Sequence, residues 1–432
     1  MSQHSILPPR RAAFAFVFVT VLLDMFAIGI IIPVLPNLIE DFMGGDTAEA
    51  AGIYGVFVTA WALMQFFFSP ILGSLSDRFG RRKVILVSNF GLGLDYILMA
   101  LAPSLGWLFV GRIISGITSA SVSTAGAYIA DVTPPAQRAS KFGLLGAAFG
   151  FGFVVGPALG GVLGDVDPRL PFWVAAGFSL TNAMYGLFVL PESLAPENRS
   201  PFSWRKANPI GALKLLRSHR ELWGLASVGF LSNLAHVALP ATAVLYMGYR
   251  YGWSIKQVGL LLAVAGVCQV IIQAGFVGRV VRALGERRTM ILGLSGGALG
   301  FFIQGIATSP PIYILGVVTM SLWGFFNPAL QGSMTRLVRQ NEQGQLQGAN
   351  SSLMGIANMV GPLIFAYVFA TFIAHREWHI PGAAFLLSAT LLTAGMVLVT
   401  RITRSQAPEV HAADSSGNGV DSKQKEQSAS GF

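Results

Sequence analysis

Three ionisable residues lie inside long apolar stretches of this 432-residue sequence: Asp24, Asp95 and Arg112. A charged side chain left unpaired at the centre of a bilayer costs about 2.5–3.5 kcal/mol, so such residues usually pair or serve a function. At about 1.5 Å per helical residue, all three are expected at a similar depth. Burial favours a protonated carboxylate and a nearby arginine favours the charged form. Proton uptake and release near neutral pH is therefore predicted, with a static ion pair as the alternative.

Amide, hydroxyl, imidazole and indole groups recur in the apolar stretches at spacings that place them on one face of a helix. Such a face packs against another helix or lines an aqueous cavity. A ligand pocket needs a few hydrogen-bonding groups in an apolar wall. For each residue, a bond to a neighbouring helix is an equal alternative. The candidate substrate-binding residues are Gln65, Ser119, Ser123, Asn233, His236, Gln269, Gln273, Trp323, Asn327, Asn350 and Asn358.

Membrane helices must position these residues. The sequence is 53% hydrophobic and 11% charged, which excludes an ordinary soluble protein. A hydrocarbon core of about 30 Å needs about 20 helical residues. The apolar windows predict an all-α integral membrane protein of twelve spans, at residues 12–33, 52–75, 83–103, 107–131, 139–164, 170–190, 221–247, 256–279, 289–308, 311–334, 345–372 and 380–400.

The two halves of the sequence repeat. Six landmarks recur at a constant offset of 205 residues, among them Gly73 with Gly278 and Asp131 with Arg336. This predicts two six-helix halves related by an axis along the membrane normal, with the binding site between them near the midplane. The predicted parts are an N-terminal bundle (1–195), a central cytoplasmic loop (196–220), a C-terminal bundle (221–403) and a disordered cytoplasmic tail (404–432).

The segment GSLSDRFGRRKVI, residues 73–85, lies between the second and third spans, and its copy at 278–290 exchanges the charges. Arg282 stands at the place of Asp77, and Glu286 at that of Arg81. A charged cluster that forms in one conformation and breaks in the other would act as a cytoplasmic gate. A solvated loop is the alternative. The candidate gating residues are Gly73, Asp77, Arg78, Gly80, Arg81, Asp131, Gly156, Pro157, Arg282, Glu286 and Arg336.

The 29 lysines and arginines concentrate in loops that share one side of the membrane if the N-terminus is cytoplasmic. The positive-inside rule therefore predicts that both termini face the cytoplasm. The net charge of +9 is a sign of topology, and nucleic-acid binding is not expected because the charges are not gathered on a folded polar surface. The single cysteine, Cys268, is expected to be a packing residue.

Other chemistries lack support. No Walker loop, nucleophile elbow or zincin motif occurs, so an enzyme is not expected. His375 and His379 flank Glu377 in an outer loop. No third partner converges on them, so a metal site is not expected.

Several motifs resemble those of the major facilitator superfamily. Residues 73–85 resemble its loop motif, FVGRIISG (109–116) its helix 4 arginine motif, and GFGFVVGPALGG (150–161) the helix 5 motif of drug:proton antiporters. Four further stretches are similar to the twelve-helix tetracycline efflux proteins, namely residues 24–36, 54–82, 126–131 and 344–348.

The resemblance implies a proton-coupled antiporter in the cytoplasmic membrane that exports amphiphilic drugs, tetracyclines first, and so gives resistance. Its partners would be the drug, alone or as a chelate with a cation, protons and the bilayer, without a cofactor or an obligate protein partner. That family has an aspartate in helix 9 linked to proton coupling, whereas Gly296 or Gly297 stands there in this sequence. Coupling would then rest on the N-terminal half. Export of another drug class, and an uptake carrier or facilitator without coupling, are the alternatives.

Overall fold

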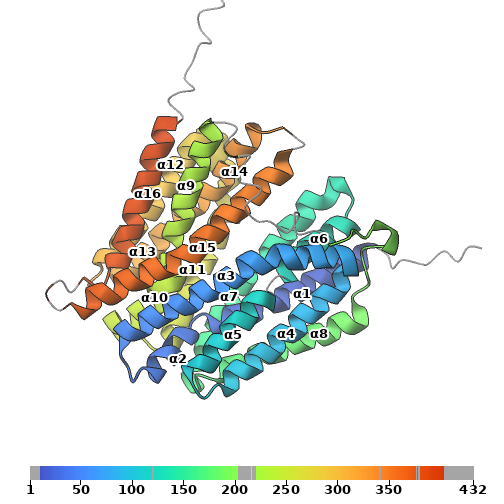
Figure 1. Ribbon diagram of the computed structural model, residues 1–432. Helices are drawn as coiled ribbons and strands as arrows, with labels where there is room; N and C mark the ends of the chain where they lie inside the picture. Colours follow the sequence, from blue (N-terminus) through green and yellow to red (C-terminus); the bar gives the residue numbers. More distant parts are fainter. Residues whose placement is uncertain are drawn as a thin grey trace, which may run out of the picture.

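The computed structural model describes residues 10–118, 121–202, 216, 220–339, 342–375, 377 and 380–402. Two helical bundles make up this part of the chain, one blue to green and one yellow to red (Figure 1). The first is formed by α1 (Arg10–Ile31), α2 (Leu35–Phe42), α3 (Thr47–Phe79), α4 (Arg81–Leu101), α5 (Leu105–Thr118), α6 (Ser121–Val132), α7 (Pro135–Val166) and α8 (Leu170–Val189).

The second bundle repeats this order. It contains α9 (Arg220–His236), α10 (Ala238–Tyr251), α11 (Ile255–Val270), α12 (Val277–Ile306), α13 (Pro310–Met320), α14 (Phe326–Arg336), α15 (Gln343–Ala374) and α16 (Ala383–Ile402). A π-helical turn, Ile271–Phe276, joins α11 to α12, and a 3₁₀ turn, Ser321–Phe325, joins α13 to α14. We call the end at which α1 begins and α16 ends the inner end of the molecule.

The structure supplies twelve crossings in its described part. Ten helices are long and apolar enough to span a membrane. One of them, Ile255–Ile306, holds two crossings because the backbone at Gly285 is non-helical, with φ of 75°. The remaining crossing is made by α5 and α6, on either side of residues 119–120. The predicted all-α membrane fold is confirmed.

Several helix boundaries differ from the prediction. The short helix α2 was not expected, and α3 begins at Thr47 instead of residue 52. The predicted span 221–247 is broken near Val237, and the span 311–334 contains the 3₁₀ turn. Each irregularity lies just before a proline, Pro240 or Pro328. Proline removes a helical N–H and its ring clashes with the carbonyl four residues earlier, which accounts for both interruptions.

Some predictions concern residues outside the described part. They include the tail 404–432, the central-loop residues 203–215 and 217–219, and the residues Ser119 and His379.

The two bundles touch over the outer part of their boundary. Helices α3 and α15 lie side by side there (Figure 1), as do α7 and α11. At Gly161 of α7, a side chain would come within 2.8 Å of the Ile255 carbonyl oxygen of α11. Further in, a side chain at Gly146 of α7 or at Gly275 of the π-helical turn that follows α11 would meet nothing within 4 Å. The structure is therefore closed outside and open at the inner end.

Candidate functional site

Asp24 is held inside the N-terminal bundle by an amide. Asn182 of α8 donates from Nδ2 to the Asp24 carboxylate at 2.9 Å and to the Thr20 carbonyl of α1 at 2.9 Å. The Asp24 and Asn182 side chains are both essentially inaccessible to solvent. A bifurcated amide of this kind fixes the carboxylate against α8 and partly offsets the cost of burying it.

Asp95 and Arg112 lie close to each other on α4 and α5. The Asp95 carboxylate is buried and accepts no hydrogen bond of normal geometry, while Ser115 and the Arg112 charge are in its surroundings. Gly111 permits this approach, because a side chain there would stand 2.9 Å from Oδ1 of Asp95. The Tyr96 hydroxyl is within electrostatic reach of Asp24, Asp95 and Arg112.

The Arg112 guanidinium does not pair with Asp95 in the described part of the chain. No nitrogen of Arg112 comes within 4.0 Å of an Asp95 oxygen, and its Nη2 instead lies 3.4 Å from the Met99 sulfur. Nε of Arg112 is buried without a hydrogen bond. Asp24, Asp95 and Arg112 thus all lie around Tyr96, but Arg112 forms no ion pair with Asp95 in this conformation.

The C-terminal bundle contributes an aromatic stack. The His236 and Trp323 rings are parallel, with an interplanar angle of 7° and centroids 4.3 Å apart. Trp323 donates from Nε1 to the Ser232 hydroxyl at 2.7 Å, and the Gln269 amide packs against Gly324 in the same 3₁₀ turn. Trp323 lies in the 3₁₀ turn and Gln273 in the π-helical turn, and these two turns pack against each other. Irregular turns of this kind are common at functional sites.

The other candidate substrate residues are less tightly grouped. Gln65, Asn233, Asn350 and Asn358 are half-buried, whereas Gln273 and Asn327 are exposed. The Asn350 Nδ2 atom is buried without a hydrogen bond in the described residues. Of the remaining two, Ser119 lies outside the described residues, and so does the side chain of Ser123.

Close packing surrounds Gly296 and Gly297 of α12, where the resemblance implies an aspartate. A side chain at Gly297 of α12 would stand 2.9 Å from Leu392 and 3.1 Å from Trp323, and one at Gly296 would overlap Leu322. Both glycines are buried. An acidic residue at either position would require the 3₁₀ turn to move.

A charged cluster lies at the inner end of the N-terminal bundle. Arg81 forms ion pairs with Asp77 at 2.5 Å and with Asp131 of α6 at 3.2 Å, and it donates to the Ser76 hydroxyl. Arg78 lies over the Phe79 ring. All these bonds stay within one bundle, so the cluster is intact while the inner ends stand apart. Its gating role remains a prediction.

The second copy of the cluster is simpler. Glu286 of α12 pairs with Arg336 of α14 at 2.9 Å and accepts from the Ser333 hydroxyl at 3.0 Å. Arg282 is exposed. The predicted charge exchange between the halves therefore produces an ion pair in each half, with the acid and the base on opposite helices.

A strap from the central loop completes the first cluster. We define the strap as residues 191–200. Its Glu192 carboxylate accepts a hydrogen bond from the main-chain N–H of Arg81 at 2.9 Å. The Ser193 hydroxyl donates to the Asp131 carboxylate at 3.1 Å, and the main-chain N–H of Ser200 donates to the Asp77 carbonyl at 3.1 Å. The Tyr128 hydroxyl donates to the Pro191 carbonyl. Gly80, with φ of 99°, lies directly under the Glu192 carboxylate.

The glycines of α7 serve two different contacts. Gly152, Gly156 and Gly160 pack on α1 of their own bundle. A Cβ atom added to Gly156 would lie 2.6 Å from the Cα of Gly29. Gly161 and the Pro157 carbonyl instead face α11 of the other bundle. Only part of this glycine run therefore lies at the boundary between the bundles. Helical periodicity explains the division, since positions one residue apart point about 100° apart.

Two residues of the site were missed by sequence reasoning. Asn182 is a lone amide in an apolar span, FSLTNAMYG, and its intramembrane position was the available signal. Glu192 lies in a polar loop, where nothing in the sequence distinguishes a helix-capping carboxylate from a solvated one.

Comparison with known proteins identifies similar chains. The sequence matches the profile of the Major Facilitator Superfamily over residues 17–362 and 228–425. It is 38% identical over 372 residues to the class C tetracycline resistance protein of Escherichia coli, covering 86% of this chain and 92% of that one. It is 34% identical over 396 residues to the class H tetracycline resistance protein of Pasteurella multocida, covering 90% and 96%.

Solved structures agree on the fold. The human organic anion transporter MFSD10 superposes with a TM-score of 0.68 at 26% identity, covering 91% of this chain and all of that one. The inward-facing, unoccupied structure of a bacterial homologue of the human lysosomal transporter Spinster superposes with a TM-score of 0.69 at 14% identity, covering 94% and 96%.

Proposed function

Because this chain belongs to the major facilitator superfamily, we propose that it exports tetracyclines across the cytoplasmic membrane in exchange for protons, with both termini in the cytoplasm. Export of the drug lowers its concentration in the cell and gives resistance. The 38% identity to a tetracycline resistance protein over most of both chains is the observation that carries the proposal.

The buried acids of the N-terminal bundle support proton coupling. Asp24 and Asp95 are each about 1% exposed, and the Arg112 charge lies among them with Tyr96. Burial of two acids at this depth is costly unless they exchange protons or pair during the cycle. The close packing around Gly296 and Gly297 of α12 supports placing the coupling in the N-terminal bundle.

The open inner end fits the loading step of an exporter. In this conformation a drug from the cytoplasm would enter between the inner ends of the bundles, and the His236–Trp323 stack with its hydrogen-bonding neighbours is the proposed aromatic contact for it. Closing the inner end and separating the outer contacts, which are Gly161 of α7 against α11 and Gly55 of α3 against Ala366 of α15, would then expose the drug to the outside. Protonation of Asp24 or Asp95 from outside would change the balance of charges around Arg112 and favour the return.

Everted membrane vesicles test this proposal. Respiring vesicles that contain the protein should accumulate tetracycline, and a protonophore should abolish the accumulation. Asp24→Asn should remove proton-driven uptake while leaving the protein in the membrane, as measured by immunoblot. Full proton-driven uptake by Asp24→Asn would contradict the assignment of coupling, and uptake indifferent to the protonophore would indicate a facilitator.

A second candidate is export of another drug class. The chain is 28% identical over 366 residues to multidrug resistance protein 2 of Bacillus subtilis, covering 83% of this chain and 89% of that one. A susceptibility panel in a host that expresses the protein separates the two candidates. Resistance limited to tetracyclines supports the first, and resistance to dyes or unrelated antibiotics supports the second.

A further inference from the structure

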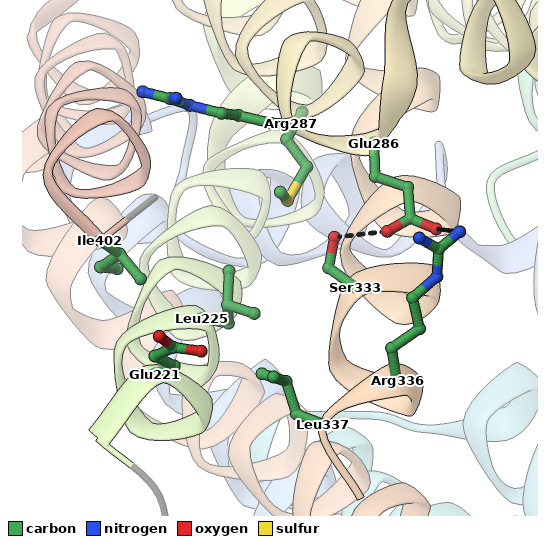
Figure 2. Close-up of a pocket in the computed structure, with 9 residues that line it drawn as sticks. Glu221, Leu225, Glu286, Arg287, Ser333, Arg336, Leu337 and Ile402 are labelled. Atoms are coloured by element: carbon green, nitrogen blue, oxygen red, sulfur yellow. Dashed lines mark hydrogen bonds and ion pairs between the residues drawn. The ribbon is translucent and has the colours of Figure 1, made fainter. Parts of the chain in front are cut away.

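The ion pairs at the inner end of the molecule stay within one bundle. Figure 2 shows a cavity of about 290 Å³ in the C-terminal bundle, where Glu286 binds Arg336 and Ser333. The residues that line this cavity all belong to the C-terminal bundle. The ion pairs of Arg81 stay likewise in the N-terminal bundle. These contacts do not join the two bundles and cannot hold the outer end closed.

At the outer end, a hydrogen bond crosses from one bundle to the other. The Tyr54 hydroxyl of α3 donates to the Pro240 carbonyl of α10 at 2.9 Å. Tyr54 is buried, and α10 lies against α3. At the next residue of α3, Gly55, an added Cβ atom would lie 2.5 Å from the Cβ of Ala366 in α15. The bond therefore forms where the bundles are in close contact, and it needs the outer ends to be together.

The carbonyl that accepts this bond belongs to the break between α9 and α10. Pro240 has no N–H to donate to the His236 carbonyl four residues earlier, and α9 ends at His236. The His236 ring is the one that stacks on Trp323. The bond thus reaches the C-terminal bundle one helical turn from the proposed drug contact.

The hydroxyl that donates this bond lies near the charge of the proposed proton site. Arg112 of α5 is within electrostatic reach of the Tyr54 hydroxyl, and α3 packs on α5. The same arginine acts on Tyr96, as do the charges of Asp24 and Asp95. Arg112 therefore lies within reach of the cross-bundle bond on one side and of the buried acids on the other.

Other charged groups on the helices packed around Tyr54 lie toward the outer loops. In its described residues, α15 carries no acidic or basic side chain. α10 carries Arg250, about 15 Å along the helix from Pro240. α2 carries Glu40 and Asp41 in its last turn. Arg112 is therefore the charged side chain best placed to act on this hydroxyl.

We propose that the Tyr54 hydroxyl is a latch, a bond that holds the outer ends together, and that Tyr54 is through Arg112 a positioning residue for the exchange of drug and proton; the second part rests on the proposed function. A guanidinium charge that no acid compensates polarises the phenolic O–H and makes it a stronger donor. Arg112 forms no ion pair with Asp95 here, so the latch is strong and the outer end is closed. When an acid loses its proton and pairs with Arg112, the latch weakens and the outer end opens.

Distances between spin labels test the latch on the full-length chain in lipid nanodiscs. In a Cys268→Ser background, labels at Ser104→Cys and Thr308→Cys report the separation of the bundles at the outer end. Labels at Lys83→Cys and Arg288→Cys report it at the inner end. These four positions are exposed, with one of each pair in each bundle. Opening of the outer end should lengthen the outer distance and shorten the inner one, whereas general loosening of the fold would broaden both.

Removal of one hydroxyl separates the latch from a structural role. Tyr54→Phe keeps the ring and should raise the outer-open population roughly twofold to tenfold. The matched control is Tyr246→Phe, because the Tyr246 hydroxyl donates to the Gln304 carbonyl inside the C-terminal bundle. It should leave both distance distributions unchanged. A Tyr54→Phe variant that behaves like Tyr246→Phe would overturn the proposal.

A double-mutant cycle tests the link to Arg112. Asp95→Asn removes an acid that would pair with Arg112 in the outer-open state, so it should lower the outer-open population. In the Tyr54→Phe background this decrease should be at least about twofold smaller, because the bond that the Arg112 charge strengthens is gone. Equal effects of Asp95→Asn in the two backgrounds would also overturn the proposal. The distances are measured without drug and without a proton gradient, so the vesicle experiment still judges the proposed transport on its own.

Discussion

At the scale of single residues, the acids of this protein are defined by what surrounds them. Asp24 accepts a hydrogen bond from the Asn182 amide. Asp95 is buried, and the Ser115 hydroxyl and the Arg112 charge lie near its carboxylate. Two carboxylates with such different surroundings are suited to different steps of one cycle, since environment sets the task of an acidic group. Asn182 acts through Asp24 and is therefore a positioning residue.

Exchange of the amide and the acid tests this pair. Asp24→Asn alone should remove proton-driven uptake, and Asp24→Asn with Asn182→Asp should restore part of it, because the exchange keeps a carboxylate and an amide within 2.9 Å. Asn182→Leu should cost about 1–3 kcal/mol of stability, because it removes the amide hydrogen bond to a buried carboxylate. Protonophore-sensitive uptake and thermal unfolding measure these effects. An exchange variant as inactive as Asp24→Asn would show that position matters more than pairing.

At the scale of helices, small residues decide where the bundles meet. A Cβ atom added to Gly55 of α3 would lie only 2.5 Å from the Cβ of Ala366 in α15. A Cβ atom added to Gly161 of α7 would meet the backbone of α11. Backbone cannot move aside as a flexible side chain does, so these positions need glycine for the outer contact to close.

Gly161→Val should therefore hold the outer ends apart. Overpacking costs about 1–3 kcal/mol, which shifts the equilibrium away from the outer-closed state by roughly fivefold to a hundredfold. Labelling of Ala366→Cys from outside, in a Cys268→Ser background, should speed up accordingly, and drug uptake should fall. Gly146→Val is the matched control on the same helix, because nothing lies within 4 Å of that position. Equal labelling in both variants would contradict the role of Gly161.

At the scale of the whole molecule, the bundles lean together at the outer end and spread toward the inner end (Figure 1). Each charged cluster keeps its bonds inside its own half, so neither holds the two halves together in this conformation. The free energy that distinguishes the two states must then come from contacts formed when the inner ends meet.

Thiol labelling tests the orientation. In a Cys268→Ser background, an impermeant reagent should label Ser104→Cys in intact cells and Arg288→Cys only in everted vesicles. Both positions are exposed and lie at opposite ends of the structure. Labelling of both from the same side would contradict the proposed topology.

The number of spans, their order and the duplication followed from sequence, because a bilayer demands about 20 apolar residues per crossing and a repeat keeps its spacing. The charge exchange between Arg81 and Glu286 was equally visible, since it needs only an alignment of the halves.

Tertiary structure decided the partners. That Asn182 holds Asp24, that Arg112 stands apart from Asp95, and that Gly152 and Gly161 of one helix face different bundles all depend on how helices rotate and approach. Helical periodicity assigns residues to a face but does not say which neighbour covers that face, because apolar helices in lipid have no hydrophobic force that selects one partner. Packing and hydrogen bonds make that choice.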